Sequence, residues 1–364
     1  MDRYLILEDG TMFEGLAFGG NAENSGEMVF NTTMTGYQEV LTDPSYSGQI
    51  VNMTYPLIGN YGINLSDSES SKIQVSGMLV RELCDTPSHS LSVDTLDNFM
   101  KHQDIPGIRN LDTRAIAKKI RTSGVMRGLL TNSADLSAGL HTLENMDAYE
   151  NINFVNGVST DEITVMPQRL AENKSPRIVI IDCGVKNNII RMLNTRGCEV
   201  VAVPDDTHYR DILDLAPDGL LISPGPGDPK LLEYIGENIK HLINKMPIMG
   251  ICLGHQIIAE SLGAKTFKLK FGHRGGNQPV QDLRTKKVYI TAQNHGYAVD
   301  PETLPPELKV SHVNLNDGTV AGLIHQHLPV FTIQYHSEAA PGPLDNMYLF
   351  DQFVEAVRQA KENS

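Results

Sequence analysis

The sequence predicts an α/β protein: a C-terminal domain with a mostly parallel sheet covered by helices on both faces, preceded by a β-rich α+β domain. Residues up to about 100 are rich in Gly, Thr, Ser, Tyr and Val and show few sustained helical patterns. A polar stretch with two prolines spans 166–176, and after it short apolar runs alternate with helical patterns. Such alternation is typical of a parallel sheet with helices on its faces. We therefore predict a β-rich domain over 1–165, a linker over 166–176 and an α/β domain over 177–364.

The N-terminal domain opens with a predicted β-hairpin. Residues 4–15 place an Asp-Gly pair between two strand-like segments, and Asp-Gly favours the tight turn of a hairpin. Residues 112–121 carry apolar side chains at helical spacing, with Asp112 or Thr113 as the cap and Gly124 after the last turn. We therefore expect two paired strands at the start of this domain and a helix near its end.

The C-terminal domain alternates predicted strands with predicted helices. Strands are expected at 177–182, 198–203, 219–223, 247–249 and 330–333. Helices are expected at 186–196, about 230–245, 257–262 and 344–362. Residues 264–335 have a more antiparallel pattern. Ligand sites in parallel sheets lie beyond the C-terminal ends of the strands, which directs attention to the segments that follow them.

A cysteine flanked by glycines follows the predicted strand at 247–249. The segment from Gly250 through Cys252 to Gly254 leads into the helical pattern at 257–262. This order of strand, sharp turn and helix is the cysteine counterpart of the nucleophile elbow. The N–H groups that open the helix would point toward the sulfur and favour thiolate over thiol. The two glycines would let the backbone turn tightly and leave room for a substrate.

A histidine and a glutamate follow the last predicted strand. His336 and Glu338 come after the apolar segment 330–333, and residues i and i+2 of an extended chain face the same side. An isolated cysteine is usually a small buried hydrophobe, and an isolated histidine is usually structural. The combination of an elbow cysteine with a His-x-Glu pair is far rarer. We therefore interpret Cys252, His336 and Glu338 as the catalytic groups of a thiol enzyme.

These three groups suit attack on a carbonyl. The thiolate would be the nucleophile, and His336 would hold or supply the proton that the leaving group needs. Glu338 would fix the tautomer and orientation of the imidazole. The resulting oxyanion needs donors, and the N–H of Leu253 directly follows the nucleophile. A second donor would come from the loop around Gly225 and Gly227 at the neighbouring strand end.

The loop at 223–229 has a second interpretation, as a phosphate cradle. Three of its residues are prolines, which lack the N–H groups that bind phosphate. The sequence contains no G-x-x-x-x-G-K-[ST], and no G-x-G-x-x-G accompanies a strand and a helix. Acyl chemistry is therefore the favoured interpretation. Another polar segment, at 293–300, is turn-like, although Asn-His-Gly is also an ordinary turn.

The composition argues against several other classes of protein. The 364 residues carry a formal net charge of −14 with no long like-charged run, which argues against nucleic acid or an anionic membrane as the main partner. Four scattered cysteines do not suit a disulfide framework, and without a C-x-x-C pair we expect no metal. No signal peptide or bilayer-spanning run is evident. We expect a cytoplasmic protein.

Several motifs together resemble a known family. Four C-terminal segments resemble the class I (triad) glutamine amidotransferases: 223–229 (SPGPGDP), 250–256 (GICLGHQ), 293–297 (QNHGY) and 334–338 (QYHSE). Four N-terminal segments resemble the small subunit of carbamoyl phosphate synthetase: 26–39, 43–49, 54–62 and 107–114. The C-terminal motifs indicate the amidotransferase superfamily. The N-terminal segments indicate which member of that superfamily the chain resembles. The resemblance covers essentially the whole chain.

The resemblance implies a glutamine-hydrolysing site. Cys252 would be the nucleophile, with His336 and Glu338 completing the triad. Gly225 and Leu253 would supply the oxyanion N–H groups. Glutamine would be bound by Ser45, Gly225, Gly227, Leu253, Gln256, Asn294, Gly296 and Tyr297. Ser45 lies far from the others in sequence, so the N-terminal domain would close one side of the pocket. Some relatives have Phe in place of Tyr297, a position expected to contribute its backbone.

The resemblance also implies a reaction and a partner. Glutamine would be hydrolysed through a γ-glutamyl thioester to glutamate and ammonia. The ammonia would pass to a large synthetase subunit, in a heterodimer, for the synthesis of carbamoyl phosphate from bicarbonate and ATP. We expect no cofactor in this chain, with ATP and Mg on the large subunit, in keeping with the missing nucleotide motifs. The product would feed pyrimidine synthesis, arginine synthesis or both.

Three alternatives remain open from the sequence. The amidotransferase component of another synthase, of the anthranilate, aminodeoxychorismate or GMP type, shares the triad but does not account for residues 1–150. A non-catalytic regulatory subunit would be favoured by loss of a triad residue, and none is lost. A thiol peptidase on a similar sheet is the third.

Overall fold

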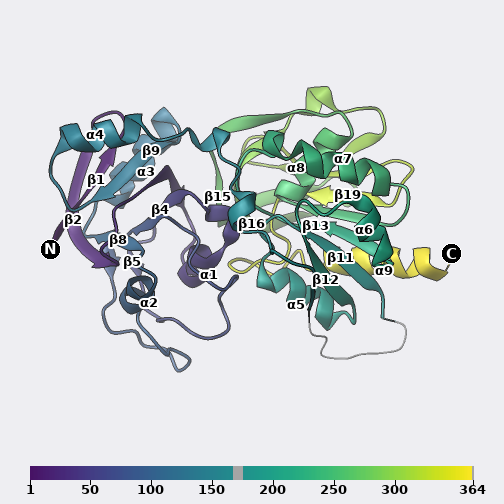
Figure 1. Ribbon diagram of the computed structural model, residues 1–364, viewed down its shortest axis with the longest axis horizontal. Coiled ribbons are helices and arrows are strands. Elements are labelled where there is room, and N and C mark those ends of the chain that lie inside the picture. The colour runs from purple at the N-terminus through teal and green to yellow at the C-terminus, as the bar shows by residue number, and fades with distance from the viewer. Residues whose placement is uncertain (167–174, 363–364) are drawn as a thin grey trace. The chain divides into compact units, whose positions relative to one another are not determined.

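The computed structural model describes residues 1–166 and 175–362 (Figure 1). Within it the chain forms two compact units, Met1–Ile152 and Asn153–Ser364. Each unit has its own sheet and its own hydrophobic core. The division into a β-rich part and an α/β part is the fold class that the sequence predicts.

The division between the units differs from the predicted boundary at residue 165. A short strand, β10 (Thr164–Met166), pairs antiparallel with β12 (Glu199–Pro204) in the sheet of the second unit. The residues just before the predicted linker therefore belong with the second unit. Most of the linker predicted at 166–176 lies outside the described residues.

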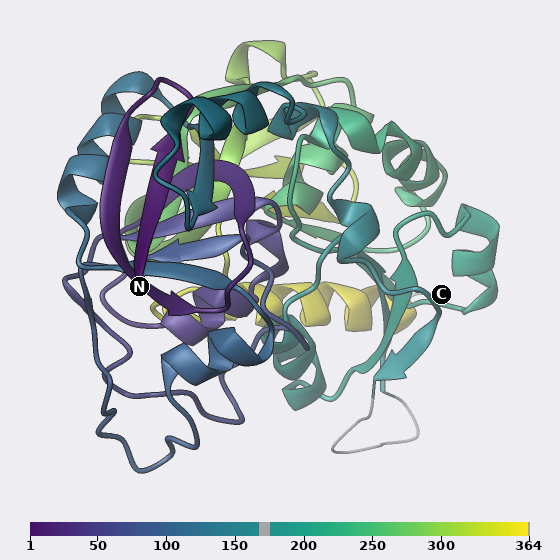
Figure 2. The same ribbon diagram turned by 60° about the vertical axis from the view of Figure 1, so that its left-hand side comes forward.

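The first unit is built around a closed barrel of strands (Figure 2). Among the described residues these strands are, in sheet order, β1 (Asp2–Leu7), β2 (Met12–Gly19), β8 (Pro106–Arg109), β6 (Gly77–Leu79), β4 (Gln49–Met53), β3 (Asn24–Asn31) and β9 (Met126–Thr131). A separate pair joins β5 (Leu57–Ile58) and β7 (Glu82–Leu83). The helical segments are α1 (Tyr37–Thr42), α2 (Leu96–His102), α3 (Thr113–Ser123), α4 (Leu136–Glu144) and the 3-10 turns η1 (Pro44–Tyr46) and η2 (Tyr149–Asn151).

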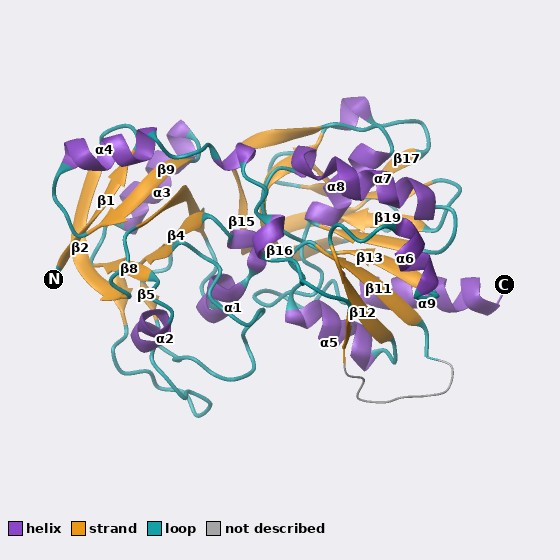
Figure 3. Cartoon of the chain, in the orientation of Figure 1, coloured by secondary structure: helices purple, strands orange, loops and turns teal. Residues whose placement is uncertain are grey.

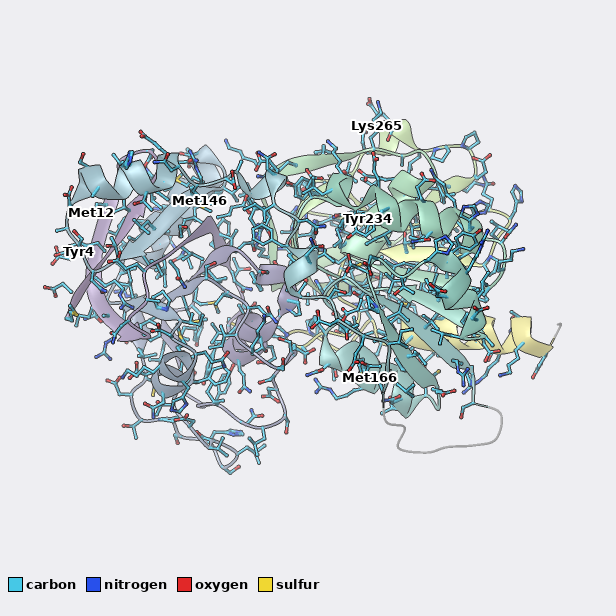
Figure 4. All side chains as sticks on the ribbon, viewed as in Figure 1. Tyr4, Met12, Met146, Met166, Tyr234 and Lys265 are labelled. Carbon is cyan, nitrogen blue, oxygen red and sulfur yellow. The ribbon has the colours of Figure 1, made fainter. Side chains whose placement is uncertain are left out.

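The predicted hairpin and helix are both present in the first unit. β1 and β2 pair antiparallel across the Asp-Gly turn, and the side chains of Tyr4 and Met12 lie on the outer side of this pair (Figure 4). The helix α3 begins after Asp112, whose carboxylate accepts a hydrogen bond from the N–H of Ala115 at 2.9 Å. The cap is therefore Asp112, the first of the two residues that the sequence offers.

The second unit contains one large mixed sheet (Figure 3). Among the described residues its strands are, in sheet order, β10, β12, β11 (Arg177–Asp182), β13 (Gly219–Ile222), β14 (Ile248–Ile251), β19 (Val330–Ile333), β18 (Val320–His325), β17 (Leu308–Asn314), β15 (Thr266–Asp282) and β16 (Val288–Val299). The strands β12, β11, β13, β14 and β19 run parallel to one another. The pairs β15–β16 and β17–β18 are antiparallel, as predicted for 264–335. The helical segments are α5 (Asn187–Thr195), α6 (Tyr209–Asp214), α7 (Glu233–Leu242), α8 (Leu253–Ser261), α9 (Tyr348–Glu362), η3 (Val155–Gly157), η4 (Pro229–Leu232) and η5 (Pro301–Thr303).

The parallel strands bury side chains on both faces of this sheet. Along β11, Val179 and Ile181 pack into the cluster that contains residues of α6, α7 and α8. The alternate residues, Ile178 and Ile180, pack into the cluster that contains residues of α5 and α9. Alternate residues of β11 face opposite sides of the sheet, and both sides are buried. The strand is therefore a continuous apolar run in the sequence. Helices cover both faces, as Figure 1 shows.

Three helices differ by several residues from their predicted bounds, and one of them, α8, begins at Leu253 instead of at residue 257. The segment predicted as one helix over about 230–245 begins as η4, and the α-helix starts only at Glu233. The last helix starts at Tyr348 rather than Leu344, because residues 344–347 form a turn in which the side chain of Asn346 donates to the Ile290 carbonyl at 3.2 Å. None of the helices in the described ranges has both the length and the apolar character needed to cross a membrane.

Candidate active site

Cys252 lies at the sharp turn between β14 and α8. Its φ of 52° and ψ of −103° lie outside the regions that L-residues usually adopt. The turn is closely packed, because a Cβ at Gly254 would lie 2.2 Å from the carbonyl oxygen of Ile222 and one at Gly250 would lie 2.6 Å from Ile258 Cδ1. Both glycines are therefore needed for the close packing of this turn. Strained backbone of this kind is typical of functional sites.

The sulfur of Cys252 is nearly enclosed, with the side chain 2% exposed. Sγ lies 3.6 Å from the carbonyl oxygen of Asn294, to which a thiol would donate. On another side the amide Nε2 of Gln334 donates to Sγ at 3.7 Å. Because Cys252 directly precedes the first residue of α8, the positive end of the helix dipole also faces the thiol.

His336 and Glu338 form a buried pair. His336 Nδ1 lies 2.6 Å from Glu338 Oε1, and both side chains are almost fully buried. The backbone N–H of His336 donates to the Ala292 carbonyl of β16 at 2.8 Å, which holds the ring-bearing residue to the sheet. The two side chains lie together as the sequence predicts, although Ser337 and Glu338 are in a turn and not in the extended chain on which that prediction is based.

Lys186 is a third member of this cluster that the sequence did not indicate. It is buried just before α5, and its Nζ donates to the Ala339 carbonyl at 2.7 Å and lies 3.1 Å from Glu338 Oε1. A lysine before a helix gives no periodic signal, so only the tertiary structure shows it beside Glu338. The Oε1 atom of Glu338 therefore contacts two groups that carry positive charge when protonated.

The charges in this cluster shift both pKa values. Burial has the largest single effect on the pKa of His336 and lowers it, but the groups around the ring, first among them the charge of Glu338, together raise that pKa to about 10. The Cys252 side chain adds to the rise, although Nε2 of His336 has no hydrogen bond of normal geometry to a described residue. Burial raises the pKa of Glu338, but Lys186 and His336 lower it to about 2. The pair is therefore imidazolium and carboxylate at neutral pH.

The loop after β13 lies beside the nucleophile turn. A Cβ at Gly225 would lie 2.8 Å from Leu253 Cδ2 and 2.1 Å from the Cys183 carbonyl. The N–H of Gly254 donates to the Ser223 carbonyl at 3.2 Å, which fixes the loop to the start of α8. The structure therefore brings together the two positions predicted to supply oxyanion donors, while that role stays a prediction. Gly227 follows in the same loop with a φ of 95°.

The remaining predicted glutamine contacts fall in two places. Gln256 Nε2 donates to the Tyr297 carbonyl at 2.9 Å, so α8 is joined to the strand that also carries Asn294 and Gly296. Ser45 lies in η1 of the first unit, where its N–H donates to Asp43 Oδ1 at 2.9 Å. Its contact with glutamine stays a prediction from the resemblance.

In the ranges that the structure describes, no group of His, Cys, Asp and Glu has the arrangement of a metal site.

Gln334 is a further site residue that the sequence reasoning missed. It lies two residues before His336, buried beside the sulfur of Cys252. The same spacing continues backward to Thr332, whose Oγ1 lies 2.7 Å from Nδ1 of His255. The period of two used for His336 and Glu338 would have placed both residues on the same face of the strand.

The chain matches two families of known proteins. Residues 179–356 match the family glutamine amidotransferase class-I, and residues 5–130 match the family carbamoyl-phosphate synthase small chain, CPSase domain. The chain is 50% identical over 360 residues to a carbamoyl phosphate synthase small chain of Methanocaldococcus jannaschii, covering 98% of this chain and 99% of that one. It is 49% identical over 357 residues to the carbamoyl phosphate synthase small chain of Fusobacterium nucleatum, covering 98% of each.

A third relative is named more narrowly. The carbamoyl phosphate synthase pyrimidine-specific small chain of Bacillus subtilis is 47% identical over 363 residues, covering 100% of this chain and 98% of that one. Identity at this level extends over both units, and so includes the N-terminal part that other amidotransferases do not explain. The chain belongs to the small chains of carbamoyl phosphate synthase, with a class I glutamine amidotransferase domain as its C-terminal part.

Proposed function

We propose that this small chain hydrolyses glutamine through a thioester on Cys252 and passes the ammonia to the large chain of carbamoyl phosphate synthase. The observation that carries the proposal is the buried His336–Glu338 pair, 2.6 Å apart, beside a cysteine held in a strained turn at the start of α8. Family membership makes the chain the glutamine-hydrolysing component. The geometry supports the assignment of Cys252, His336 and Glu338 to the hydrolysis.

The first half of the reaction forms the thioester. Cys252 attacks the side-chain carbonyl of glutamine as the thiolate, and a C–S bond forms as the carbonyl oxygen gains negative charge. The N–H groups of Leu253 and Gly225 would bind that oxygen. His336, protonated at neutral pH because of Glu338, gives its proton to the nitrogen as the C–N bond breaks, and ammonia leaves.

The second half releases glutamate. Water attacks the thioester carbon, and the imidazole of His336, now neutral, takes the proton from it. The C–S bond breaks and the sulfur returns to its starting state. Glu338 keeps the ring oriented through Nδ1 in both halves, so Nε2 is the nitrogen that exchanges protons with the reacting groups.

The proposal includes a partner and a location for the other substrates. We assign ATP and Mg to the large chain, which would form a heterodimer with this one in the cytoplasm. Glutamine would be bound by the residues that the resemblance indicates around Gly225, Gln256 and Tyr297. The name of the Bacillus subtilis relative supports a place in pyrimidine synthesis. If the complex also supplied carbamoyl phosphate for arginine synthesis, arginine as well as UMP should regulate it.

The test is Cys252→Ser, assayed in the complex with the large chain. Glutamine-dependent synthesis should fall by several orders of magnitude, because the nucleophile is lost, while synthesis from added ammonia should survive. The matched control is Cys84→Ser, at a half-buried cysteine of the first unit, which should leave both activities unchanged. Equal loss of the two activities in Cys252→Ser would instead show a structural role for the sulfur.

A further inference from the structure

A buried carboxamide contacts the sulfur without belonging to the triad. Gln334 directly follows β19 and is 2% exposed. Its Nε2 donates to Cys252 Sγ at 3.7 Å. A glutamine buried to this degree has lost its hydrogen bonds to water, so its polar atoms need protein partners. Both of its polar atoms have one, and one partner is the reacting atom.

The direction in which Gln334 presents its amide is set by its neighbours. The Tyr297 carbonyl only accepts hydrogen bonds, so Gln256 must turn Nε2 toward it, at 2.9 Å. The same Nε2 also donates to Gln334 Oε1 at 3.0 Å. Gln334 Oε1 therefore faces Gln256, and Nε2 is left to face the sulfur. If Gln334 were turned over, two NH₂ groups would face one another and an amide oxygen would face the sulfur.

The sulfur thus lies between an acceptor and a donor. The Asn294 carbonyl at 3.6 Å suits a thiol, since it accepts the S–H, and it repels a thiolate. The Gln334 N–H at 3.7 Å suits a thiolate, because a hydrogen bond strengthens when its acceptor is charged. An amide does this without a charge of its own and therefore leaves the proton on His336 undisturbed.

We propose that Gln334 is a catalytic residue of the glutaminase reaction, whose amide N–H holds the Cys252 thiolate, and that Gln256 is the positioning residue that sets its orientation. This deepens the proposed function and rests on it for the role of Cys252 as nucleophile. The N–H···S bond is stronger to a thiolate than to a thiol or to the neutral sulfur of the thioester, so the amide favours the charged form that attacks. Gln334 therefore holds Sγ in place for the attack.

The proposal also gives Gln256 a second role. Gln256 is one of the residues that the resemblance assigns to glutamine binding, and Tyr297 is another. A substrate that contacts either residue would be linked to the sulfur through the two amide hydrogen bonds of Gln256. A change at Gln256 should therefore alter the reactivity of the sulfur even when no glutamine is present.

The test is the alkylation of Cys252 by iodoacetamide in the full chain, without glutamine, followed by mass spectrometry across a range of pH. Gln334→Met keeps the length of the side chain but removes the donor. Its alkylation rate at neutral pH should fall about tenfold, the size expected for a hydrogen bond to a charged group, and the profile of rate against pH should move to higher pH. In the complex with the large chain, kcat for glutamine should fall while KM changes little.

The matched control is Gln38→Met, which removes an equally buried amide in the first unit, where Nε2 donates to the Asn64 carbonyl at 2.7 Å. It should leave the alkylation of Cys252 unchanged. Gln256→Glu places a carboxylate against Gln334 Oε1, so it should slow alkylation in the same direction as Gln334→Met. If Gln334→Met proves poorly folded in a thermal unfolding scan, the Gln256 variant carries the test.

The outcomes separate the two proposals. Alkylation of Gln334→Met at the wild-type rate and with the wild-type pH profile would overturn the role of Gln334. If instead the wild-type complex uses no glutamine although its Cys252 alkylates rapidly, the proposed function fails. The comparison of the alkylation profiles still decides whether the amide acts on the sulfur.

Discussion

At the scale of single residues, the site is controlled by which charged groups are buried together. His336 has Glu338 on one ring nitrogen, and Lys186 contacts the same carboxylate oxygen, Oε1. Burial and the lysine lower the pKa of the imidazole, and the charge and hydrogen bond of Glu338 together with Cys252 outweigh them. Glu338 is therefore the main group that keeps the proton on His336 that the leaving ammonia needs.

Glu338→Gln tests this directly. The amide removes the charge that raises the pKa of His336 and leaves burial and Lys186, which lower it, against the smaller effect of Cys252, which raises it. The pKa should fall from about 10 to below neutrality, so the ring loses its proton as pH rises through a much lower value. NMR titration of the labelled imidazole measures this shift. Glu355→Gln, on the exposed side of α9, is the control, and an unchanged titration in Glu338→Gln would contradict the assignment.

At the scale of secondary-structure elements, most of the site is predictable because it follows two local patterns. The strand, turn and helix around Cys252 are visible as an apolar run, a glycine-flanked cysteine and a helical pattern. His336 and Glu338 follow from the period of two in an extended chain. Gln334 follows from the same period, yet a glutamine carries no chemical signal that draws attention to it. Lys186 has no pattern at all, since only the packing of α5 against the segment after β19 brings it to Glu338.

The glycines of the turn give a prediction about stability. A Cβ at Gly254 would lie 2.2 Å from the backbone oxygen of Ile222, which has no flexible end that can move aside. Gly254→Ala should therefore cost at least about 2 kcal/mol of the free energy of unfolding in urea, as expected for overpacking against backbone. Gly157→Ala is the control, because a Cβ there has nothing within 4 Å. A cost for Gly254→Ala no larger than that of the control would contradict this account of the turn.

At the scale of the whole molecule, the two fold types are predictable but the point of division is not. A domain boundary placed from composition falls at the polar, proline-containing stretch, whereas β10 joins the second sheet just before it. Three residues of strand give too short a pattern to assign from sequence. The identity of the first unit as part of a synthase small chain comes from its motifs, since its strands alone predict only a β-rich domain. The role of Ser45 in binding glutamine likewise comes only from the motifs of the resemblance, so it stays a prediction.

The second unit also buries histidines that the reaction does not use, and they affect stability. Burial lowers the pKa of His255 to about 3, and it lowers the pKa values of His295 and His312 as well. Below pH of about 6.5 the unfolded chain binds protons at these positions and the folded chain does not. Each such group therefore contributes stability that is present above that pH and is lost as the pH falls toward the folded pKa.

His255 allows this contribution to be measured, because it is fully buried on α8 with Nδ1 bonded to Thr332 and does not contact the sulfur. Replacing it by glutamine removes the titration but keeps hydrogen-bonding groups. Between pH 6 and pH 4 the free energy of unfolding in urea of the wild type should fall more steeply, by up to about 1.4 kcal/mol per pH unit, than that of His255→Gln. Above pH 7 the two slopes should coincide, which serves as the internal control. Parallel slopes over the whole range would show that His255 takes up its proton in the folded protein as readily as in the unfolded chain.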